Sequence, residues 1–322
     1  MLSKKIPLWI CFLFYFFTVY SQGQPLQAVQ QKKVSCNKAA VVSAHPLASM
    51  AGIEIIKKGG NAFDAAIATQ LALAVVYPGA GNLGGGGFLV AHTKNGNNIC
   101  IDYRETAPGL SHKDMYLDKD SIPIPSLSQK GHLACGTPGT VAGLFATMKY
   151  ARLHFSKLVD PAIKLAENGF PVSASQAKSL NDNRAHFLTA NRKQTAFTKD
   201  SLWKEGDILK QPELAYTLKR IRNNGPDEFY KGSIARQIVD EMATANGIIS
   251  LQDLANYKAI LRPPVEFDYK GYRIVSAPLP SSGGIMLAQM MKMVENRNIA
   301  AMGFQTAESV QLMVEIERRA YA

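Results

Sequence analysis

The sequence has few of the residues that form metal centres and disulfide frameworks. Of its 322 residues, four are cysteine and six are histidine. The histidines have none of the spacings at which metal ligands occur, so we expect no metal site. Cys11 lies in the N-terminal apolar run, which leaves Cys36, Cys100 and Cys135 at wide spacing. Two interpretations of these remaining cysteines stay open, namely one disulfide with a free thiol, or three buried thiols.

The sequence also lacks a nucleotide-binding motif in the structural context that such a motif requires. Residues 79–84 read GAGNLG, which has the spacing of the dinucleotide-binding fingerprint, and Asp102 follows at a suitable distance. That fingerprint needs a strand before the glycines and a helix after them, whereas here a helix pattern precedes and a hairpin pattern follows. No Gly-Lys pair occurs in the chain, which excludes a phosphate-binding loop of the G-x-x-x-x-G-K kind. We therefore expect no nucleotide and no other cofactor.

The run Gly84 to Gly87 then needs a structural explanation. We interpret these glycines as the place where a helix turns into a central strand between closely packed neighbours. Glycine suits such a turn because it tolerates positive φ and allows close backbone approach.

Charged residues make up only 19% of the chain and hydrophobic residues 47%, a composition typical of a globular protein. The formal net charge is +11. The lysines and arginines are scattered, with no dense basic stripe interleaved with aromatic residues, so the sequence does not favour a nucleic-acid partner.

The N-terminus has the pattern of a secretory signal peptide. Lys4 and Lys5 precede an apolar run of about 15 residues, and Ser21 supplies a small residue at its end. We predict a signal peptide over residues 1–21 and a mature region over 22–322, exported to the periplasm or the extracellular space. Cleavage removes two lysines and lowers the net charge from +11 to +9. The alternative is an uncleaved membrane anchor, for which the run is short.

The rest of the chain alternates helix signals with a few strand signals. We expect helices over residues 46–58, 61–76, 137–150, 160–168, from 173 into a charged stretch at 181–206, and over 212–223, 232–245, 250–257, 285–296 and from 306 onward. Two hairpins are expected, one around Asn95-Gly96 and one around Lys270-Gly271. Hairpins in place of βαβ units predict an α+β fold, with helices layered on an antiparallel sheet.

Arg104 is the one side chain whose position suggests ligand binding. It stands in IDYRETAPG, where a predicted strand runs out into a Pro-Gly turn. A planar guanidinium at such a place can bind a carboxylate through two parallel hydrogen bonds. On residue type alone, a structural salt bridge to Asp102 or Glu105 is the favoured interpretation.

Six segments resemble, in order and spacing, the large subunit of γ-glutamyltranspeptidase. They lie within residues 36–322 and read AVVSAHPLASMAGIEIIKKGGNAFDAAIA, GNLGGGGFLVAH, IDYRETAP, GTPGTVAGL, NGIISLQDLANYKAILRPPV and PLPSSGG. The resemblance implies the αββα sandwich of the N-terminal-nucleophile hydrolases, present here only as the large-subunit portion. It also implies an exported precursor that cuts itself into a large and a small subunit.

The same resemblance implies a γ-glutamyltransferase, also called glutathione hydrolase. A threonine at the new N-terminus of the small subunit attacks the γ-glutamyl amide of glutathione and related compounds. The acyl group then passes to water, an amino acid or a peptide. The threonine's own α-amino group can serve as the base.

For the site residues, the resemblance implies that Arg104 binds the α-carboxylate of the γ-glutamyl group, which reverses the preference given above. The nucleophilic threonine is expected beyond Ala322, so this chain holds no catalytic residue. Residues 281–284, SSGG, superficially resemble serine and glycine pairs of the small subunit, but their position matches a large-subunit loop. The alternative function is a non-catalytic γ-glutamyl-binding or scaffold protein of the same family. A related acylase is disfavoured by the arginine motif.

Overall fold

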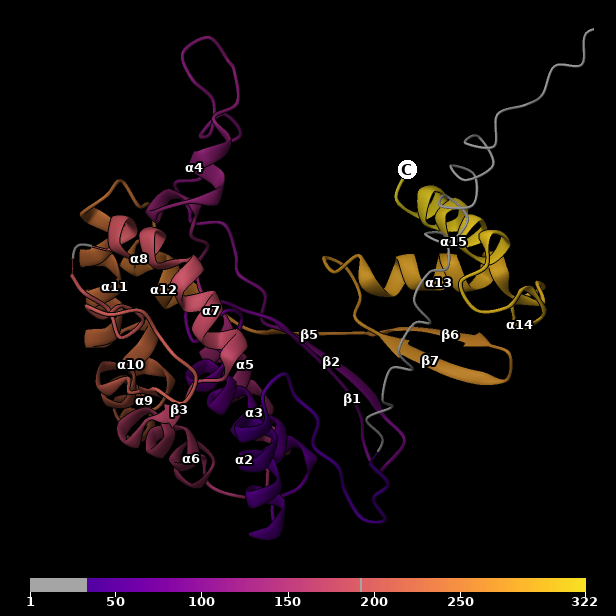
Figure 1. The fold of residues 1–322 in the computed structure, drawn as a ribbon, viewed down its shortest axis with the longest axis horizontal. Coiled ribbons are helices and arrows are strands. Elements are labelled where there is room, and N and C mark those ends of the chain that lie inside the picture. Colours follow the sequence, from indigo (N-terminus) through magenta and orange to yellow (C-terminus); the bar gives the residue numbers. More distant parts are fainter. Residues whose placement is uncertain (1–33, 192) are drawn as a thin grey trace, which may run out of the picture. The chain divides into compact units, whose positions relative to one another are not determined.

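The structure is a computed structural model that describes residues 34–191 and 193–322. The predicted signal peptide, residues 1–21, lies outside the described residues. The chain divides after Ala40 into two units, and the described part of the first, residues 34–40, forms neither helix nor strand. The second unit, residues 41–322, contains every helix and strand given below (Figure 1). Within the described residues, no helix is both long and apolar enough to cross a membrane.

Residues 41–322 combine many helices with short antiparallel strands. The α-helices are α2 (Pro46–Lys57), α3 (Ala62–Val76), α4 (Pro125–Gln129), α5 (Thr140–Thr147), α6 (Phe155–Asn168), α7 (Ala174–Asp182), α8 (Arg184–Ala190), α9 (Pro212–Asn224), α10 (Pro226–Tyr230), α11 (Ser233–Ala243), α12 (Leu251–Asn256), α13 (Gly283–Val294), α14 (Ile299–Met302) and α15 (Ala307–Ala320). The strands are β1 (Phe88–His92), β2 (Asn98–Asp102), β3 (Phe170–Pro171), β4 (Ile208–Leu209), β5 (Ile260–Arg262), β6 (Val265–Tyr269) and β7 (Tyr272–Ser276). This mixture confirms the predicted α+β class.

Helix α3 lies at the centre of the hydrophobic core. Its sequence AFDAAIATQLALAVV is almost wholly apolar, and it packs against α2, α5 and α6, so it is covered on several sides. The helix begins with a capping box, in which the Asn61 side chain accepts from the N–H of Asp64 and Asp64 accepts from the N–H of Asn61. The fully buried Asp64 carboxylate also accepts from the N–H groups of Arg152 and Leu153. One side chain thus caps α3 and fixes the segment that leads into α6.

One hairpin and a third strand from much further along the chain form a three-stranded sheet. Strands β1 and β2 pair antiparallel, with Phe88 opposite Asp102, and β5 pairs antiparallel with β2. The order β1-β2-β5 leaves β1 at an edge within the described residues, so the expectation of a central strand after the glycines is wrong here. Both predicted hairpins are confirmed, the second as β6 and β7 with Lys270 and Gly271 at the turn.

The start of α6 corrects one helix prediction. The sequence predicts a helix from Asp160-Pro161, but α6 begins at Phe155 and contains Pro161 in its interior. His154 caps the true N-terminus by accepting from the N–H of Ser156. An apolar face that includes Leu158 is buried in the core, and this burial outweighs the local preference of proline for the first turn.

Other helix boundaries differ for local reasons. Helix α5 begins at Thr140, later than the predicted 137, because Thr137 pairs with Thr106 in an isolated β-bridge. The charged stretch 181–206 contains α8, and α10 precedes α11, two short helices that the sequence pattern does not predict. The described cysteines form no disulfide, and only Cys100 is buried, so the hypothesis of three buried thiols is wrong at Cys36 and Cys135.

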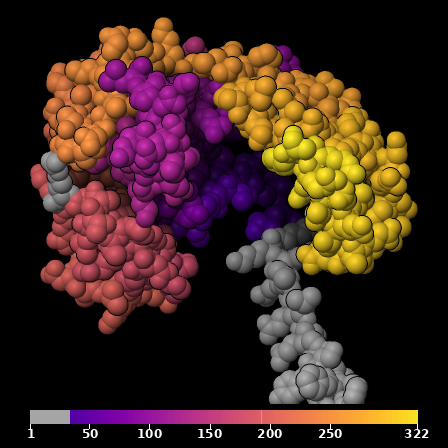
Figure 2. Space-filling view, turned by 90° about the horizontal axis from the view of Figure 1, so that it is seen from above, coloured from indigo at the N-terminus to yellow at the C-terminus, as the bar shows by residue number. Residues whose placement is uncertain are grey.

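The C-terminal elements follow β5 as a hairpin with helices packed on it. Helix α13 contacts β6, β7 and α15, and α14 contacts α15. Thr306 caps α15 as predicted, by accepting from the N–H of Ser309. In space-filling form, the orange and yellow surface of this segment faces the purple residues after β2 across a hollow (Figure 2).

Candidate functional site

Arg104 lies two residues past the end of β2, at the point where the sheet gives way to loop. Main-chain hydrogen bonds between Tyr103 and Gly87 extend the β1–β2 pairing by one residue pair, at 3.0 and 3.3 Å. The Tyr103 side chain is buried, and its hydroxyl donates to Gln70 of α3 at 3.3 Å. Burial raises the pKa of this hydroxyl. Because successive side chains in extended chain alternate between faces, Arg104 points away from the core and is exposed.

The main chain of Arg104 is held at both of its polar groups. Its N–H donates to Oδ1 of Asp102 at 3.0 Å, and its carbonyl oxygen accepts from the Tyr257 hydroxyl at 2.7 Å. The guanidinium Nη1 donates to the carbonyl oxygen of Pro280 at 3.3 Å. Three segments that are distant in sequence, around Arg104, Tyr257 and Pro280, therefore meet here.

The salt bridge that residue type alone favours for Arg104 does not form. Oδ2 of Asp102 pairs with Nε of Arg262 on β5 at 2.7 Å, and the Asp102 side chain is only 6% exposed. Within the described residues, Arg104 has no ion pair with Asp102, Glu105 or any other carboxylate. Most of the guanidinium fork is thus available to a ligand carboxylate, and the neutral carbonyl of Pro280 leaves its charge uncompensated.

The glycine run packs against the main chain at Arg104. A Cβ on Gly86 would lie 2.5 Å from the carbonyl oxygen of Tyr103 and 2.9 Å from Cα of Arg104, both backbone atoms. A Cβ on Gly87 would lie 2.9 Å from the Tyr103 ring. Close backbone approach, as predicted, explains these two glycines. The expectation of positive φ is wrong for the run, because none of Gly84 to Gly87 has a positive φ.

Gly85 connects the same run to α5. Its carbonyl oxygen accepts from the N–H groups of Gly139 and Thr140 at 2.7 and 3.0 Å, where α5 begins. Its own N–H donates to the side chain of Asn82, which also accepts from the Thr140 hydroxyl. The loop therefore satisfies the free N–H groups of a helix N-terminus with main-chain oxygen, and those N–H groups are not left for a phosphate.

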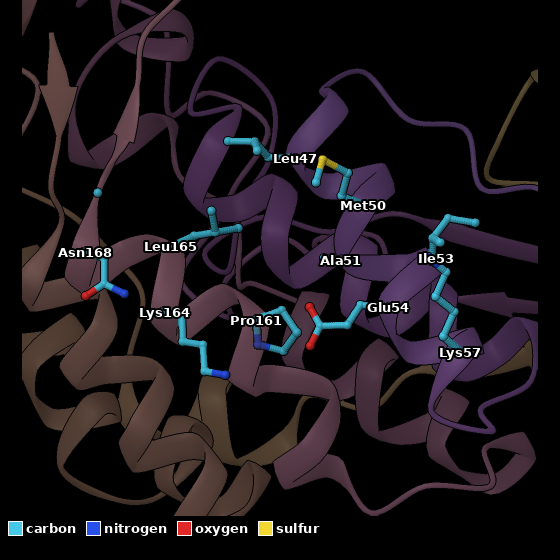
Figure 3. A pocket seen from close by; sticks show the side chains of 11 residues that line it. Leu47, Met50, Ala51, Ile53, Glu54, Lys57, Pro161, Lys164, Leu165 and Asn168 are labelled. Carbon is cyan, nitrogen blue, oxygen red and sulfur yellow. The ribbon is translucent and has the colours of Figure 1, made fainter. Parts of the chain in front are cut away.

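A groove elsewhere on the surface offers no comparable guanidinium. It has a volume of about 490 Å³ and lies between α2 and α6, with a lining that does not include Arg104 (Figure 3). Its walls are mainly apolar, from Leu47, Met50 and Leu165 among others, and its one carboxylate, Glu54, pairs with Lys58. Within the described residues, no three His, Cys, Asp or Glu side chains gather as metal ligands.

Two residues that contact Arg104 are absent from the predicted site. Tyr257 and Pro280 lie 153 and 176 residues further along the chain, so no local spacing connects them to it. The only sequence signal is that they stand in NGIISLQDLANYKAILRPPV and PLPSSGG, two segments that carry the family resemblance. Residues 281–284 lead into α13, where Gly284 is buried against the carbonyl of Ala277, which agrees with a structural loop.

Comparison with known proteins identifies the family. The family model described as Gamma-glutamyltranspeptidase matches residues 48–322. The chain is 46% identical over 292 residues to the glutathione hydrolase proenzyme of Escherichia coli (strain K12), covering 90% of this chain and 50% of that protein. It is 38% identical over 311 residues to the glutathione hydrolase proenzyme of Bacillus subtilis (strain 168), covering 95% and 53%.

A solved structure of the same family is also similar to this chain. The crystal structure of Helicobacter pylori gamma-glutamyltranspeptidase superposes with a TM-score of 0.87 at 43% identity, covering 90% of this chain and 84% of that chain. The chain spans about half the length of the curated relatives it matches.

Proposed function

The chain belongs to the gamma-glutamyltranspeptidase family, and we propose that it is the large-subunit portion of a γ-glutamyltransferase, or glutathione hydrolase. In this proposal, a continuation corresponding to the second half of the relatives supplies the small subunit from the same precursor. We call this chain together with that continuation the complete protein. It cleaves the γ-glutamyl amide of glutathione and related compounds, and passes the acyl group to water, amino acids or peptides.

Arg104 binds the α-carboxylate of the γ-glutamyl group in this proposal. The observation that carries it is an exposed guanidinium with a fixed main chain and no carboxylate partner within the described residues. A carboxylate that leaves water loses its hydration, and two parallel charge-assisted hydrogen bonds from one guanidinium replace it. The family match over residues 48–322 includes this position.

The chemistry itself belongs to the continuation. Its threonine hydroxyl adds to the γ-carbonyl, the hydroxyl proton passes to the threonine's α-amino group, and the amine of the donor leaves with that proton. Water or an acceptor amine then releases the glutamyl group from the ester. Arg104 takes no part in these bond changes, because it binds the other end of the glutamyl group.

Two further proposals concern the whole assembly. The continuation completes an αββα sandwich on the β1-β2-β5 sheet, whose outer strands offer Val90 and Leu261, 39% and 64% exposed. The edge strands present unpaired main-chain N–H and C=O groups, with which a further strand can pair. Residues 1–21 direct export, so that the mature region 22–322 acts in the periplasm or outside the cell.

Substitution of Arg104 in the complete protein tests the assignment. Arg104→Ala removes the guanidinium, and we expect kcat/KM for a γ-glutamyl anilide to fall by about 30-fold to several thousand-fold, with Arg104→Lys in between. A donor analogue without the α-carboxylate should react poorly with the unchanged protein and lose little more in Arg104→Ala. Self-cleavage should survive both substitutions.

Arg273→Ala provides a matched control, since it removes an exposed arginine whose partners are Glu266 and Asp268 on its own hairpin. It should leave the discrimination between the two donors unchanged. An equal loss for both donors in Arg104→Ala would show that Arg104 has only a structural role.

A further inference from the structure

Helix α12 and the residue that ends it touch the Arg104 loop at two points. Tyr257, the C-terminal cap of α12, donates its hydroxyl proton to the carbonyl oxygen of Arg104 at 2.7 Å. Oδ1 of Asp253 accepts from the N–H of Gly109 at 2.8 Å, five residues after Arg104. The loop from Arg104 to Gly109 is thus fixed near both of its ends by one short helix.

The helix itself is well anchored. Ser250 and Asp253 form a capping box at its N-terminus, and Leu254 is fully buried in the core. Burial would raise the pKa of the Asp253 carboxyl, but hydrogen bonds from Ser250 and Gly109 outweigh it and lower the pKa. Asp253 is therefore ionised at neutral pH and remains an acceptor for the Gly109 N–H.

A second tyrosine packs against the ring of Tyr257. Its ring stacks on Tyr230, with ring centroids 5.8 Å apart and an angle of 7° between the planes. The Tyr230 hydroxyl donates to Pro138 at 3.0 Å and accepts from the N–H of Ala142 at 3.1 Å, so that ring is tied to the start of α5. The Tyr257 hydroxyl occupies the space that a Cβ on residue 139 would need, so Gly139 allows this close approach.

The hydroxyl of Tyr257 stays a donor over the whole physiological range. Burial raises its pKa, and the nearby charges of Asp102 and Glu105 raise it further. An ionised Tyr257 would repel the carbonyl oxygen of Arg104, whereas the neutral hydroxyl binds it. Asp102 holds the N–H of Arg104 and Tyr257 holds its C=O, so the peptide groups on both sides of the residue are fixed.

We propose that Tyr257 is a positioning residue for substrate recognition: its hydroxyl fixes the main chain of Arg104, so that the guanidinium meets the donor's α-carboxylate with both hydrogen bonds aligned. This inference rests on the proposed function of Arg104. The guanidinium lies at the end of a long side chain, so a small rotation of the main chain at Arg104 displaces it by a large distance. It binds a carboxylate through two aligned hydrogen bonds only when that main chain is fixed. Tyr257 touches neither the substrate nor the reacting atoms.

Tyr257→Phe in the complete protein tests the proposal, because it removes the hydroxyl and keeps the stacking ring. We expect KM for a γ-glutamyl anilide to rise about fivefold to twentyfold, the loss of one well-aligned hydrogen bond, while kcat changes by less than about twofold. Tyr116→Phe is the matched control. It removes another tyrosine hydroxyl that donates to a main-chain carbonyl, that of Leu133, and should leave KM unchanged.

The donor analogue without the α-carboxylate separates positioning from general damage. For this donor, Tyr257→Phe should change KM by less than about twofold, and in the Arg104→Ala background it should add nothing for either donor. A rise in KM that is equal for both donors, or that persists without Arg104, overturns the inference. So does an unchanged KM in Tyr257→Phe when Arg104→Ala discriminates between the donors. If Arg104→Ala itself fails to discriminate between the donors, the proposed role of Arg104 is wrong and the positioning role of Tyr257 falls with it.

Discussion

Residues 41–262 and residues 263–322 differ in what covers their apolar side chains. The cluster of buried hydrophobic residues that forms the core extends from Ala48 to Leu254, all within the first region. In the second region, α15 carries Val310, Met313 and Val314, which are 46%, 54% and 54% exposed. Exposed apolar residues grouped on one element mark an interaction surface more often than a free one.

The quality of the helices does not explain this difference. Helix α15 is capped by Thr306, much as α3 is capped by Asn61, and both helices run for four turns or so. Local signals therefore determine where each helix forms, and burial depends on whether a second surface is present. For the second region we attribute the missing surface to the proposed continuation.

Truncation of one apolar side chain in each region should give the largest contrast in stability. Leu158 is fully buried, so Leu158→Ala should lower the free energy of unfolding of residues 22–322 by about 2–5 kcal/mol. Val314→Ala in the same protein should change it by less than about 0.5 kcal/mol, because Val314 is half exposed. Chemical denaturation followed by circular dichroism measures both values.

Val314→Ala in the complete protein then tests whether the continuation covers α15. If the continuation packs on this helix, the cost of Val314→Ala should rise to about 1 kcal/mol or more, since burial of a methyl group contributes about that much. A cost that stays near zero in the complete protein would mean that the face is free in both.

The sequence predicts most of the longer helices in both regions and the two hairpins, because caps, turn residues and apolar periodicity act locally. It predicts Arg104 as a ligand-binding residue only through the family resemblance, since residue type favours a salt bridge that the structure gives to Arg262. The contacts with Tyr257 and Pro280 could not be predicted, because they depend on how β5 and the loop before α13 return to β2. Helix α6 was misplaced because burial of Phe155 and its neighbours outweighs a local proline signal.

Glycine substitutions should give the next largest contrast. Gly86→Ala places a Cβ against the backbone of Tyr103 and Arg104, which cannot move without disturbing β2, so we expect a loss of about 1–3 kcal/mol. Gly283→Ala, at the start of α13, meets only the Ser281 hydroxyl at 3.4 Å and should be neutral or slightly stabilising. Thermal unfolding of the two variants measures the difference.

The same thermal assay also tests whether the glycine run binds a nucleotide. Addition of NAD or ATP should produce no thermal shift in the unchanged protein, because the glycine run supports Arg104 and α5. A saturable stabilisation by either nucleotide would contradict this structural role of the run.

The smallest contrast is expected between two carboxylates with arginine partners. In the first region, Glu228 is 9% exposed and pairs with Arg220 at 2.8 Å, while the Ser233 hydroxyl donates to it at 2.8 Å. The Ser233 hydroxyl, and after it the Arg220 charge, hold the pKa of Glu228 below its usual value of 4.5, against the opposing effect of burial. In the second region, Arg318 and then Arg319 lower the pKa of Glu315, which is well exposed.

A carboxylate whose pKa is lower in the folded state stabilises the fold above its unfolded pKa, and this stability is lost as pH falls through the folded pKa. Glu228→Gln, which resembles the protonated form, should therefore cost about 1 kcal/mol at pH 7. The cost should shrink towards zero as the pH is lowered past 4.5 and through the folded pKa. Glu315→Gln should show little cost at any pH and less still at high salt, because solvent and ions screen an exposed pair.

Denaturation curves at several pH values between 7 and 3 measure both variants. A cost for Glu228→Gln that does not change with pH would assign its effect to lost packing or hydrogen-bond geometry, and an equally large cost for Glu315→Gln would show that the second region is as well covered as the first.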